Sequence, residues 1–284
     1  MASSDSERHL RAQACSGLLT PTLRCPYLTY VGRDPASHRL MCAPWKVGGA
    51  PDALCVAASV GCTEQAQWER HFVELAPYCR LHVFGDGDGD GDRVNRLMHG
   101  TRFTFHHVTI LPSSNLADES ALSTNVESKT TQLAAHPTRT IDSLLLTLPE
   151  IDEHINKNGD YQKFDANNFE RTVDFLKIDL GPENALRNEL LVRSVLEHLE
   201  LNTNSTVCQL LVTVYYRDQF SSFVRLMCAI EEAGFEMIVK QPVAACAVSN
   251  GCTHFAYLHR RCLRHYNLDI SDTTKGNFES KSDS

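Results

Sequence analysis

Short apolar runs alternate with amphipathic segments over most of the chain. The runs are rich in β-branched, aromatic or aliphatic residues and end at glycine, proline or polar residues, as strands do. Seven of them are predicted as strands: 53–61, 79–86, 102–110, 172–180, 208–216, 235–241 and 253–261. Because helical segments separate most of these runs, the pattern indicates an α/β fold with a largely parallel sheet.

Helical periodicity is clearest in four segments. Trp68, Phe72, Leu75 and Ala76 recur at i, i+4, i+7 and i+8, and similar stripes follow at 141–148, 186–199 and 220–230. Gly234 stands where a left-handed residue would end the last of these helices. A shorter helix is predicted near 92–99. The last two strands have no helix between them, so they are predicted to form a hairpin.

The organisation predicted from these patterns is one large domain with two tails. Residues 1–40 are expected to be a disordered or irregular N-terminal extension, 41–265 the folded domain, and 266–284 a disordered polar tail. With 42% hydrophobic and 22% charged residues, 284 residues can bury a full core.

Hydropathy and charge exclude several classes of protein. No run reaches the roughly 18 apolar residues that span a bilayer, and the first twenty residues lack the apolar core of a signal peptide. A cytoplasmic location is therefore favoured. The net charge of −8 argues against nucleic acid as a partner. A small molecule, a sugar or a protein is the expected substrate.

Eleven cysteines include no Cys-x-x-Cys pair, so no metal site is predicted. Cys55, Cys79 and Cys208 lie in or beside apolar runs and are interpreted as small buried hydrophobes. A second group lies nearer the chain ends and is able to pair in an oxidising compartment: Cys25, Cys42, Cys246, Cys252 and Cys262. The odd total leaves at least one free thiol.

The repeat GDGDGDGD at 85–92 resembles the start of a calcium loop. Counting from Asp86 the twelfth position is Leu97, and counting from Asp88 it is His99, so the closing bidentate acid of an EF-hand is missing. An acidic loop after the second strand is the favoured interpretation.

The order of elements predicts a Rossmann-like seven-stranded class I methyltransferase sheet with a C-terminal antiparallel hairpin. In such a sheet a nucleotide-like cofactor lies over the ends of the first two strands, here at Ser59 to Cys62 and at Asp86. An oxidoreductase that binds a nucleotide cofactor is the rival. It is less well supported, because the first turn, S-V-G-C-T-E, lacks Gly-x-Gly-x-x-Gly and no Tyr-x-x-x-Lys occurs.

Five segments in order resemble the methyltransferase-like domain related to the FkbM family of S-adenosylmethionine-dependent methyltransferases. They are LCVAASVGCTEQAQWE, LHVFGD, TRTIDSLL, VDFLKID and QLLVTVYY, within residues 40–262. The resemblance implies S-adenosylmethionine as the cofactor. Its implied contacts are Ser59 and Gly61 in the first turn, Glu69 on the first helix, and Asp86, which would hold the ribose hydroxyls.

The segment from Thr172 to Asn184 is predicted as a buried strand that ends on carboxylates and leads into a helix. From Leu176 onward the family usually has Leu-Lys-Ile-Asp-Ile-Glu-Gly-Ala-Glu. This chain keeps Asp179 but continues Leu-Gly-Pro-Glu-Asn, so the two later acids of the family motif are displaced or lost. Glu183 is the acid that is able to replace one of them. Asp179 and Glu183 are the predicted catalytic residues, with Asp179 orienting the substrate or acting as general base. Two alternatives stay open: Asp179 caps the next helix, or the domain is an inactive methyltransferase-like binding or scaffolding protein.

Overall fold

The structure is a computed structural model, and every structural statement below concerns the residues that it describes. These are 20–34, 38–49, 51, 55–61, 66–85, 94, 96, 98, 101–113, 137–148, 171–215, 220–243, 252–266 and 268. The predicted tail beyond 268, most of the helix predicted at 92–99 and the acidic loop from Asp86 to Asp92 lie outside them.

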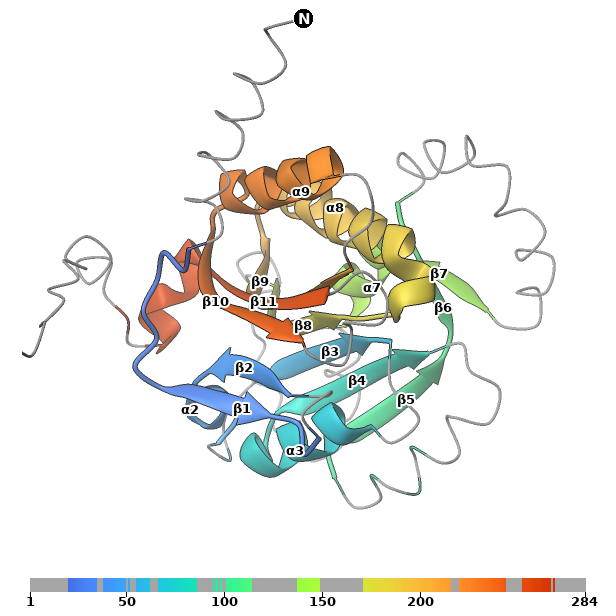
Figure 1. Ribbon diagram of the computed structural model, residues 1–284. Helices are drawn as coiled ribbons and strands as arrows, with labels where there is room; N and C mark the ends of the chain where they lie inside the picture. Colours follow the sequence, from blue (N-terminus) through green and yellow to red (C-terminus); the bar gives the residue numbers. More distant parts are fainter. Residues whose placement is uncertain are drawn as a thin grey trace, which may run out of the picture.

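A seven-stranded sheet forms the centre of the molecule (Figure 1). Its order is β10-β11-β9-β8-β3-β4-β5. The bounds are β3 Val56–Val60, β4 Arg80–Gly85, β5 Phe103–His107, β8 Arg171–Ile178, β9 Ser205–Tyr215, β10 Phe235–Val243 and β11 Cys252–His259. The first five in the chain run parallel, and β11 pairs antiparallel with both β9 and β10. The predicted class I methyltransferase sheet with its terminal hairpin is therefore confirmed.

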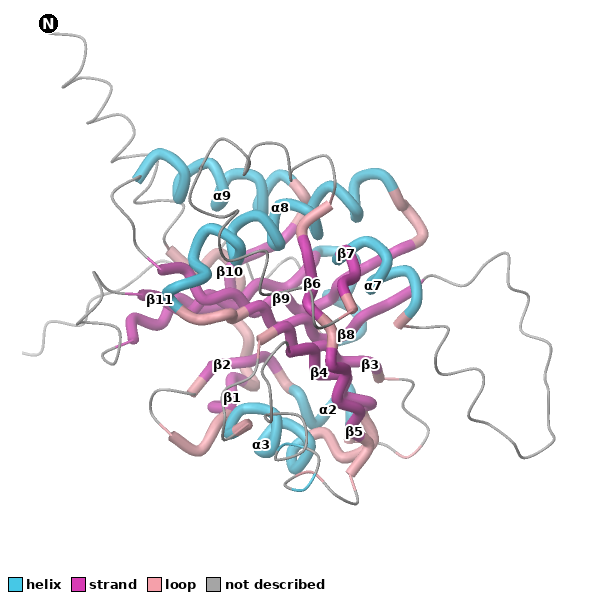
Figure 2. Tube along the Cα trace, turned by 90° about the vertical axis from the view of Figure 1, so that its right-hand side faces the viewer, coloured by secondary structure: helices cyan, strands magenta, loops and turns pink. Residues whose placement is uncertain are grey.

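Helices cover both faces of this sheet, as Figures 1 and 2 show from two directions. One face carries α7 (Ile141–Thr147), α8 (Ala185–Leu201) and α9 (Phe220–Glu232). The other carries α2 (Pro44–Gly48), α3 (Gln67–Leu75) and the 3-10 helix η4 (Arg260–Tyr266). Alternate side chains of a strand point to opposite faces of the sheet. In β3, for example, Ala57 joins the core on the α3 side and Ala58 the core on the α8 side.

The chain turns sharply after β8. Gly181 adopts a φ of +89°, and Pro182 then begins a short 3-10 helix, η2 (Pro182–Asn184), that leads directly into α8. At the far end of α9, Gly234 has a φ of +91°, as predicted for a residue that ends a helix. A separate pair of short parallel strands, β6 (Thr109–Leu111) and β7 (Thr138–Thr140), precedes α7.

The N-terminal segment is more regular than the sequence suggested. Strands β1 (Leu28–Val31) and β2 (Arg39–Cys42) pair antiparallel and form a hairpin on the α3 side of the sheet. Val31 and Met41 are fully buried in the core of that side. Residues 20–34 and 38–40, expected to be irregular, are thus part of the folded unit.

Three disulfides tie the described residues together: Cys25–Cys42, Cys55–Cys79 and Cys208–Cys262. Cys252 is also disulfide-bonded, while Cys228 is a free cysteine. The interpretation of Cys55, Cys79 and Cys208 as unpaired buried hydrophobes is wrong. They are buried, but each lies beside a second cysteine that the tertiary fold brings close, and sequence spacing does not show such neighbours.

None of the helices in the described part of the chain is both long and apolar enough to cross a membrane.

The disulfides are expected to supply a large part of the folding free energy. Cys208–Cys262 spans 54 residues and Cys55–Cys79 spans 24, so serine replacement of each pair should lower the free energy of unfolding by about 4 and about 3 kcal/mol. Chemical denaturation of the two double variants measures this. Cys228→Ser is the matched control and should leave the unfolding midpoint unchanged. A wild-type protein equally stable with and without a reducing agent would contradict the prediction.

Candidate functional site

The carboxyl ends of β3, β4, β8 and β9 meet at one edge of the sheet, where the predicted site residues gather. Val60 at the end of β3 lies beside Phe84 of β4 and Ile178 of β8. The chain leaves β3 through Gly61, whose φ is +85°. A Cβ at this position would lie 2.0 Å from the backbone oxygen of Asp179, so only glycine allows the two strand ends to approach this closely.

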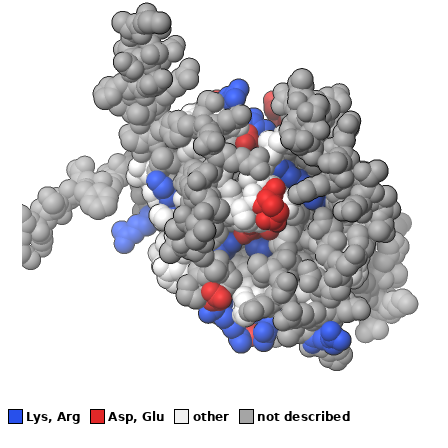
Figure 3. All heavy atoms as spheres, turned by 45° about the vertical axis from the view of Figure 1, so that its right-hand side comes forward, with Lys and Arg blue, Asp and Glu red and all other residues white. Residues whose placement is uncertain are grey.

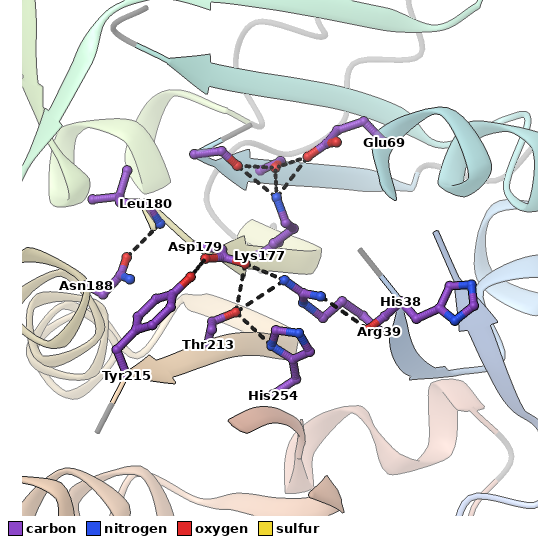
Figure 4. A network of polar contacts seen from close by, with 12 residues as sticks. His38, Arg39, Glu69, Lys177, Asp179, Leu180, Asn188, Thr213, Tyr215 and His254 are labelled. Carbon is purple, nitrogen blue, oxygen red and sulfur yellow. Dashed lines mark hydrogen bonds and ion pairs between the residues drawn. The ribbon is translucent and has the colours of Figure 1, made fainter. Parts of the chain in front are cut away.

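Next to this edge, a buried polar cluster joins β3, β8 and α3; it contains Lys177 and Glu69 (Figure 4). The ammonium of Lys177 donates to Glu69 Oε1 at 2.9 Å, to Ser59 Oγ at 3.1 Å and to the Gly61 carbonyl at 2.8 Å. Ser59 Oγ donates to the same Glu69 oxygen at 2.7 Å. All three side chains are buried, with Glu69 only 1% exposed. The cluster therefore fixes the turn after β3 from inside.

Three of the four predicted cofactor contacts, Ser59, Gly61 and Glu69, are thus brought together by the fold. The Ser59 hydroxyl, the Glu69 carboxylate and the Gly61 carbonyl all accept from Lys177, and the Gly61 amide donates to the Phe84 carbonyl at 3.0 Å. The residues hold the loop that follows rather than presenting these groups outward. Asp86 lies outside the described residues. Because β3 and β4 are parallel neighbours, their carboxyl ends lie side by side, which fits a cofactor placed over both.

Asp179 follows β8 and makes a complete set of polar contacts. One carboxylate oxygen accepts from Tyr215 at 2.7 Å, and the other accepts from Thr213 at 2.8 Å and from the Arg39 guanidinium, with which it forms an ion pair. The N-cap residues of η2 and α8 are Gly181 and Asn184, and neither makes a side-chain capping hydrogen bond. The alternative in which Asp179 caps the following helix is therefore wrong.

The charge of Asp179 is strongly favoured in this setting. Burial alone would raise the pKa of Asp179, but the charges of Arg39 and Lys177 and the hydrogen bonds from Tyr215 and Thr213 outweigh it and hold the pKa far below its usual range. Burial, followed by the charge of Asp179, raises the pKa of Tyr215 well above its usual value. Asp179 is an anion at any physiological pH and has little affinity for a proton.

Arg39 was not among the residues predicted from sequence. It lies on β2, and the amide of Gln209 holds that strand on the sheet: Cys42 N–H donates to Oε1 at 3.0 Å, and Nε2 donates to the Cys42 carbonyl at 2.7 Å. The Cys25–Cys42 disulfide fixes the same residue. No motif around Arg39 marks it, because its partner is 140 residues away in the chain.

Glu183 lies in η2, at the exposed side of the same turn. Its carboxylate accepts from Asn184 Nδ2 at 3.1 Å and lies against Gly181. Its charge also contributes to the raised pKa of Tyr215, after the larger effects of burial and Asp179. Glu183 is thus close to the Asp179 network, and its catalytic role stays a prediction.

The Arg39–Asp179 pair is expected to be worth several kcal/mol, since both side chains are about nine-tenths buried. Removing either charge leaves the other buried and unpaired, so Arg39→Met and Asp179→Asn should each lower the free energy of unfolding by about 3–5 kcal/mol. The double variant should lose less than the sum of the two. Denaturant unfolding of the four proteins at pH 7 tests this double-mutant cycle.

A matched control is the exposed pair Arg33–Glu74, whose side chains are 49% and 47% exposed. Glu74→Gln should change stability little, because water screens that pair. Additive losses in the Arg39 and Asp179 cycle would show that the two buried charges are not coupled.

Comparisons with known proteins identify a family for this chain. A family described as "Methyltransferase domain" matches residues 11–169, more than half of the 284 residues. No curated protein gives a significant match. The narrower resemblance to the FkbM family is not tested by these findings and stays a prediction.

Several solved structures are similar at low sequence identity. The N-methyltransferase NodS from Bradyrhizobium japonicum WM9 is 10% identical, with 72% of this chain and 85% of that chain covered and a TM-score of 0.35. The Methanococcus jannaschii fibrillarin pre-rRNA processing protein is 8% identical, with 82% and 88% covered and a TM-score of 0.39.

A precorrin-6y C5,15-methyltransferase from Geobacter metallireducens GS-15 is 9% identical, with 76% of this chain and 84% of that chain covered and a TM-score of 0.29. At such scores the order of strands, rather than the similarity itself, establishes the fold. The match over residues 11–169 shows the family: the chain belongs to the methyltransferase-domain family.

Proposed function

We propose that the protein is an S-adenosylmethionine-dependent methyltransferase that acts on a small molecule, a sugar or a protein. The observation that carries the proposal is that the carboxyl ends of β3, β4 and β8 meet at one edge of the sheet. In a member of a methyltransferase-domain family, the carboxyl ends of β3 and β4 lie side by side, next to the end of β8 with Asp179. Open α/β sheets bind their ligands in the crevice at this edge.

The residues proposed to hold the cofactor are those at the ends of β3 and β4. Ser59, Gly61 and Glu69 fix the first turn through Lys177, and Asp86 would accept hydrogen bonds from the ribose hydroxyls. S-adenosylmethionine supplies an activated methyl group on a positively charged sulfur. The protein would then bind the substrate in line with that group and exclude water.

Asp179 is better suited to orienting neighbouring groups than to removing a proton. Its depressed pKa gives it little proton affinity at neutral pH, and its oxygens are already bonded to Arg39, Thr213 and Tyr215. Because both oxygens of Asp179 already have partners within the protein, the second candidate function is an inactive binding or scaffolding protein. The oxidoreductase alternative is distinguished from both by its cofactor.

The disulfides change the expected location of the protein. Disulfides persist in oxidising compartments and are rare in the cytosol, so the three described pairs favour an oxidising compartment over the cytoplasmic location expected from the sequence. Nucleic acid is not proposed as a partner, because the net charge is −8. On the face shown in Figure 3, both acidic and basic side chains appear in the described part.

Cofactor binding is the first test. Isothermal titration of the full chain with S-adenosylmethionine should give heat, and Asp86→Ala should weaken binding by about tenfold or more, the worth of a hydrogen bond to a charged group. Asp90→Ala, in the same acidic loop, is the matched control and should bind as the wild type does. The absence of heat at millimolar ligand, or unchanged affinity in Asp86→Ala, would refute the assignment. Heat with NAD instead would favour an oxidoreductase.

Methyl transfer is the second test. Labelled methyl groups from S-adenosylmethionine should enter a small-molecule, sugar or protein fraction of cell extract. Asp179→Asn should abolish turnover while the cofactor still binds, measured at a temperature where the variant is folded. Glu183→Gln tests the second predicted catalytic residue and should lower turnover. Labelling of nucleic acid alone would contradict the proposed substrates, and cofactor binding without any transfer would favour the inactive alternative.

A further inference from the structure

His254 lies beside Thr213 in the same polar network as Asp179 (Figure 4), on the strand that borders β9 opposite to β8. It belongs to β11, where it is the direct neighbour of Thr213 on β9. Its Nδ1 lies 2.9 Å from Thr213 Oγ1, and that hydroxyl is 2.8 Å from Asp179. A chain of hydrogen bonds therefore connects His254 to Asp179.

The direction of each proton in this chain follows from chemistry. Asp179 is ionised and only accepts, so the Thr213 hydroxyl donates its proton to Asp179. Thr213 Oγ1 in turn accepts from His254, which places the histidine proton on Nδ1. Burial, and then the charge of Arg39, lowers the pKa of His254 to about 3. The ring is neutral at pH 7, and Nε2 carries a lone pair.

That lone pair has no hydrogen-bond partner among the described residues, although His254 is only 4% exposed. Gln241 faces His254 across the β10–β11 pair, and its Oε1 is also buried without a partner there. Both residues line one small cavity beneath β2, together with Arg39 and Leu40. Two residues with buried hydrogen-bond acceptors thus line the same space, and neither acceptor is bonded to a donor among the described residues.

We propose that His254 Nε2 and Gln241 Oε1 form a subsite that accepts hydrogen bonds from a hydroxyl or amine of the methyl-accepting substrate. The inference rests on the proposed function, because it adds the substrate side to the edge that would hold the cofactor. Hydroxyls and amines carry the donors that the two acceptors lack. A carboxylate or phosphate would bring further acceptors, and the charge of Arg39 is already matched by Asp179.

The cavity has no room for even a water molecule in this structure, and Arg39 lines it from β2. A substrate group therefore reaches the two acceptors only when the Arg39 side chain or the β2 segment moves. Asp179 and Thr213 are positioning residues in this scheme, since they act on the substrate through His254 by fixing its tautomer.

Nitrogen NMR of the full chain labelled in its histidines tests the subsite directly. His254, assigned as the resonance missing in His254→Phe, should be neutral with its proton on Nδ1 at pH 7. Methyl glucoside or ethanolamine should shift the Nε2 resonance, whereas acetate and inorganic phosphate should not. A proton on Nε2, no shift with either donor probe, or an equal shift with acetate would overturn the proposal. Which donor probe binds more tightly distinguishes a sugar from an amine.

Two variants separate this role from a structural one. Gln241→Leu should weaken binding of the donor probe by roughly tenfold, the worth of one hydrogen bond, while keeping or raising the unfolding midpoint because an unpartnered oxygen is removed. His82→Phe is the matched control, since His82 Nε2 is likewise buried without a partner among the described residues, but on β4. It should leave the probe affinity unchanged. Equal probe affinity in Gln241→Leu and wild type would overturn the proposal.

Failure of this inference is distinguishable from failure of the proposed function. Binding of S-adenosylmethionine without any response of His254 to the donor probes overturns the subsite alone. A response of His254 in a protein that does not bind S-adenosylmethionine supports a donor-binding site and refutes the methyltransferase assignment.

Discussion

A carboxylate that lies inside a protein stays ionised only where positive charge and hydrogen-bond donors surround it, and the site of this chain depends on meeting that condition at Asp179. Arg39 supplies the main opposite charge, and Thr213 and Tyr215 supply the donors. Arg39 comes from the β1–β2 hairpin, so the hairpin is part of the site. Gln209 and the Cys25–Cys42 disulfide hold it in place, which links the redox state of the N-terminal segment to the electrostatics of the strand edge.

A second buried ion pair, Lys177–Glu69, lies on the α3 side of the sheet, as the Arg39–Asp179 pair does. Strand alternation turns Ser59 and Lys177 toward α3, which supplies Glu69. Lys177 also contributes to the low pKa of Asp179, after burial and Arg39, so the two sets are electrostatically connected. Together they contain two cations and two anions. This balance explains how four ionised side chains are buried beside one strand edge.

The architecture could be predicted from sequence because its signals are local. The apolar run of β8, the stripe of α8 and the missing helix between β10 and β11 each lie within one segment, and together they give the order of the sheet. The β1–β2 hairpin gave no comparable signal, since its strands have four residues each. Arg39, the disulfide partners and the inward direction of Glu69 depend on contacts between distant segments, which no periodicity encodes. Asp179 and Gly61 were found because they end strands.

Some polar groups at this edge are bonded to other protein groups, and others have no partner among the described residues. This difference indicates which groups are able to bind a ligand. Asp179, Lys177 and Glu69 have their partners inside the protein, so a ligand would have to displace those partners before it could bind them. His254 Nε2 and Gln241 Oε1 lack partners among the described residues, so a donor that reaches them breaks none of their own hydrogen bonds, although Arg39 or the β2 segment must first move. We therefore propose that Asp179 is the anion that orients the edge, and that the two acceptors beside it, which lack partners among the described residues, recognise the substrate.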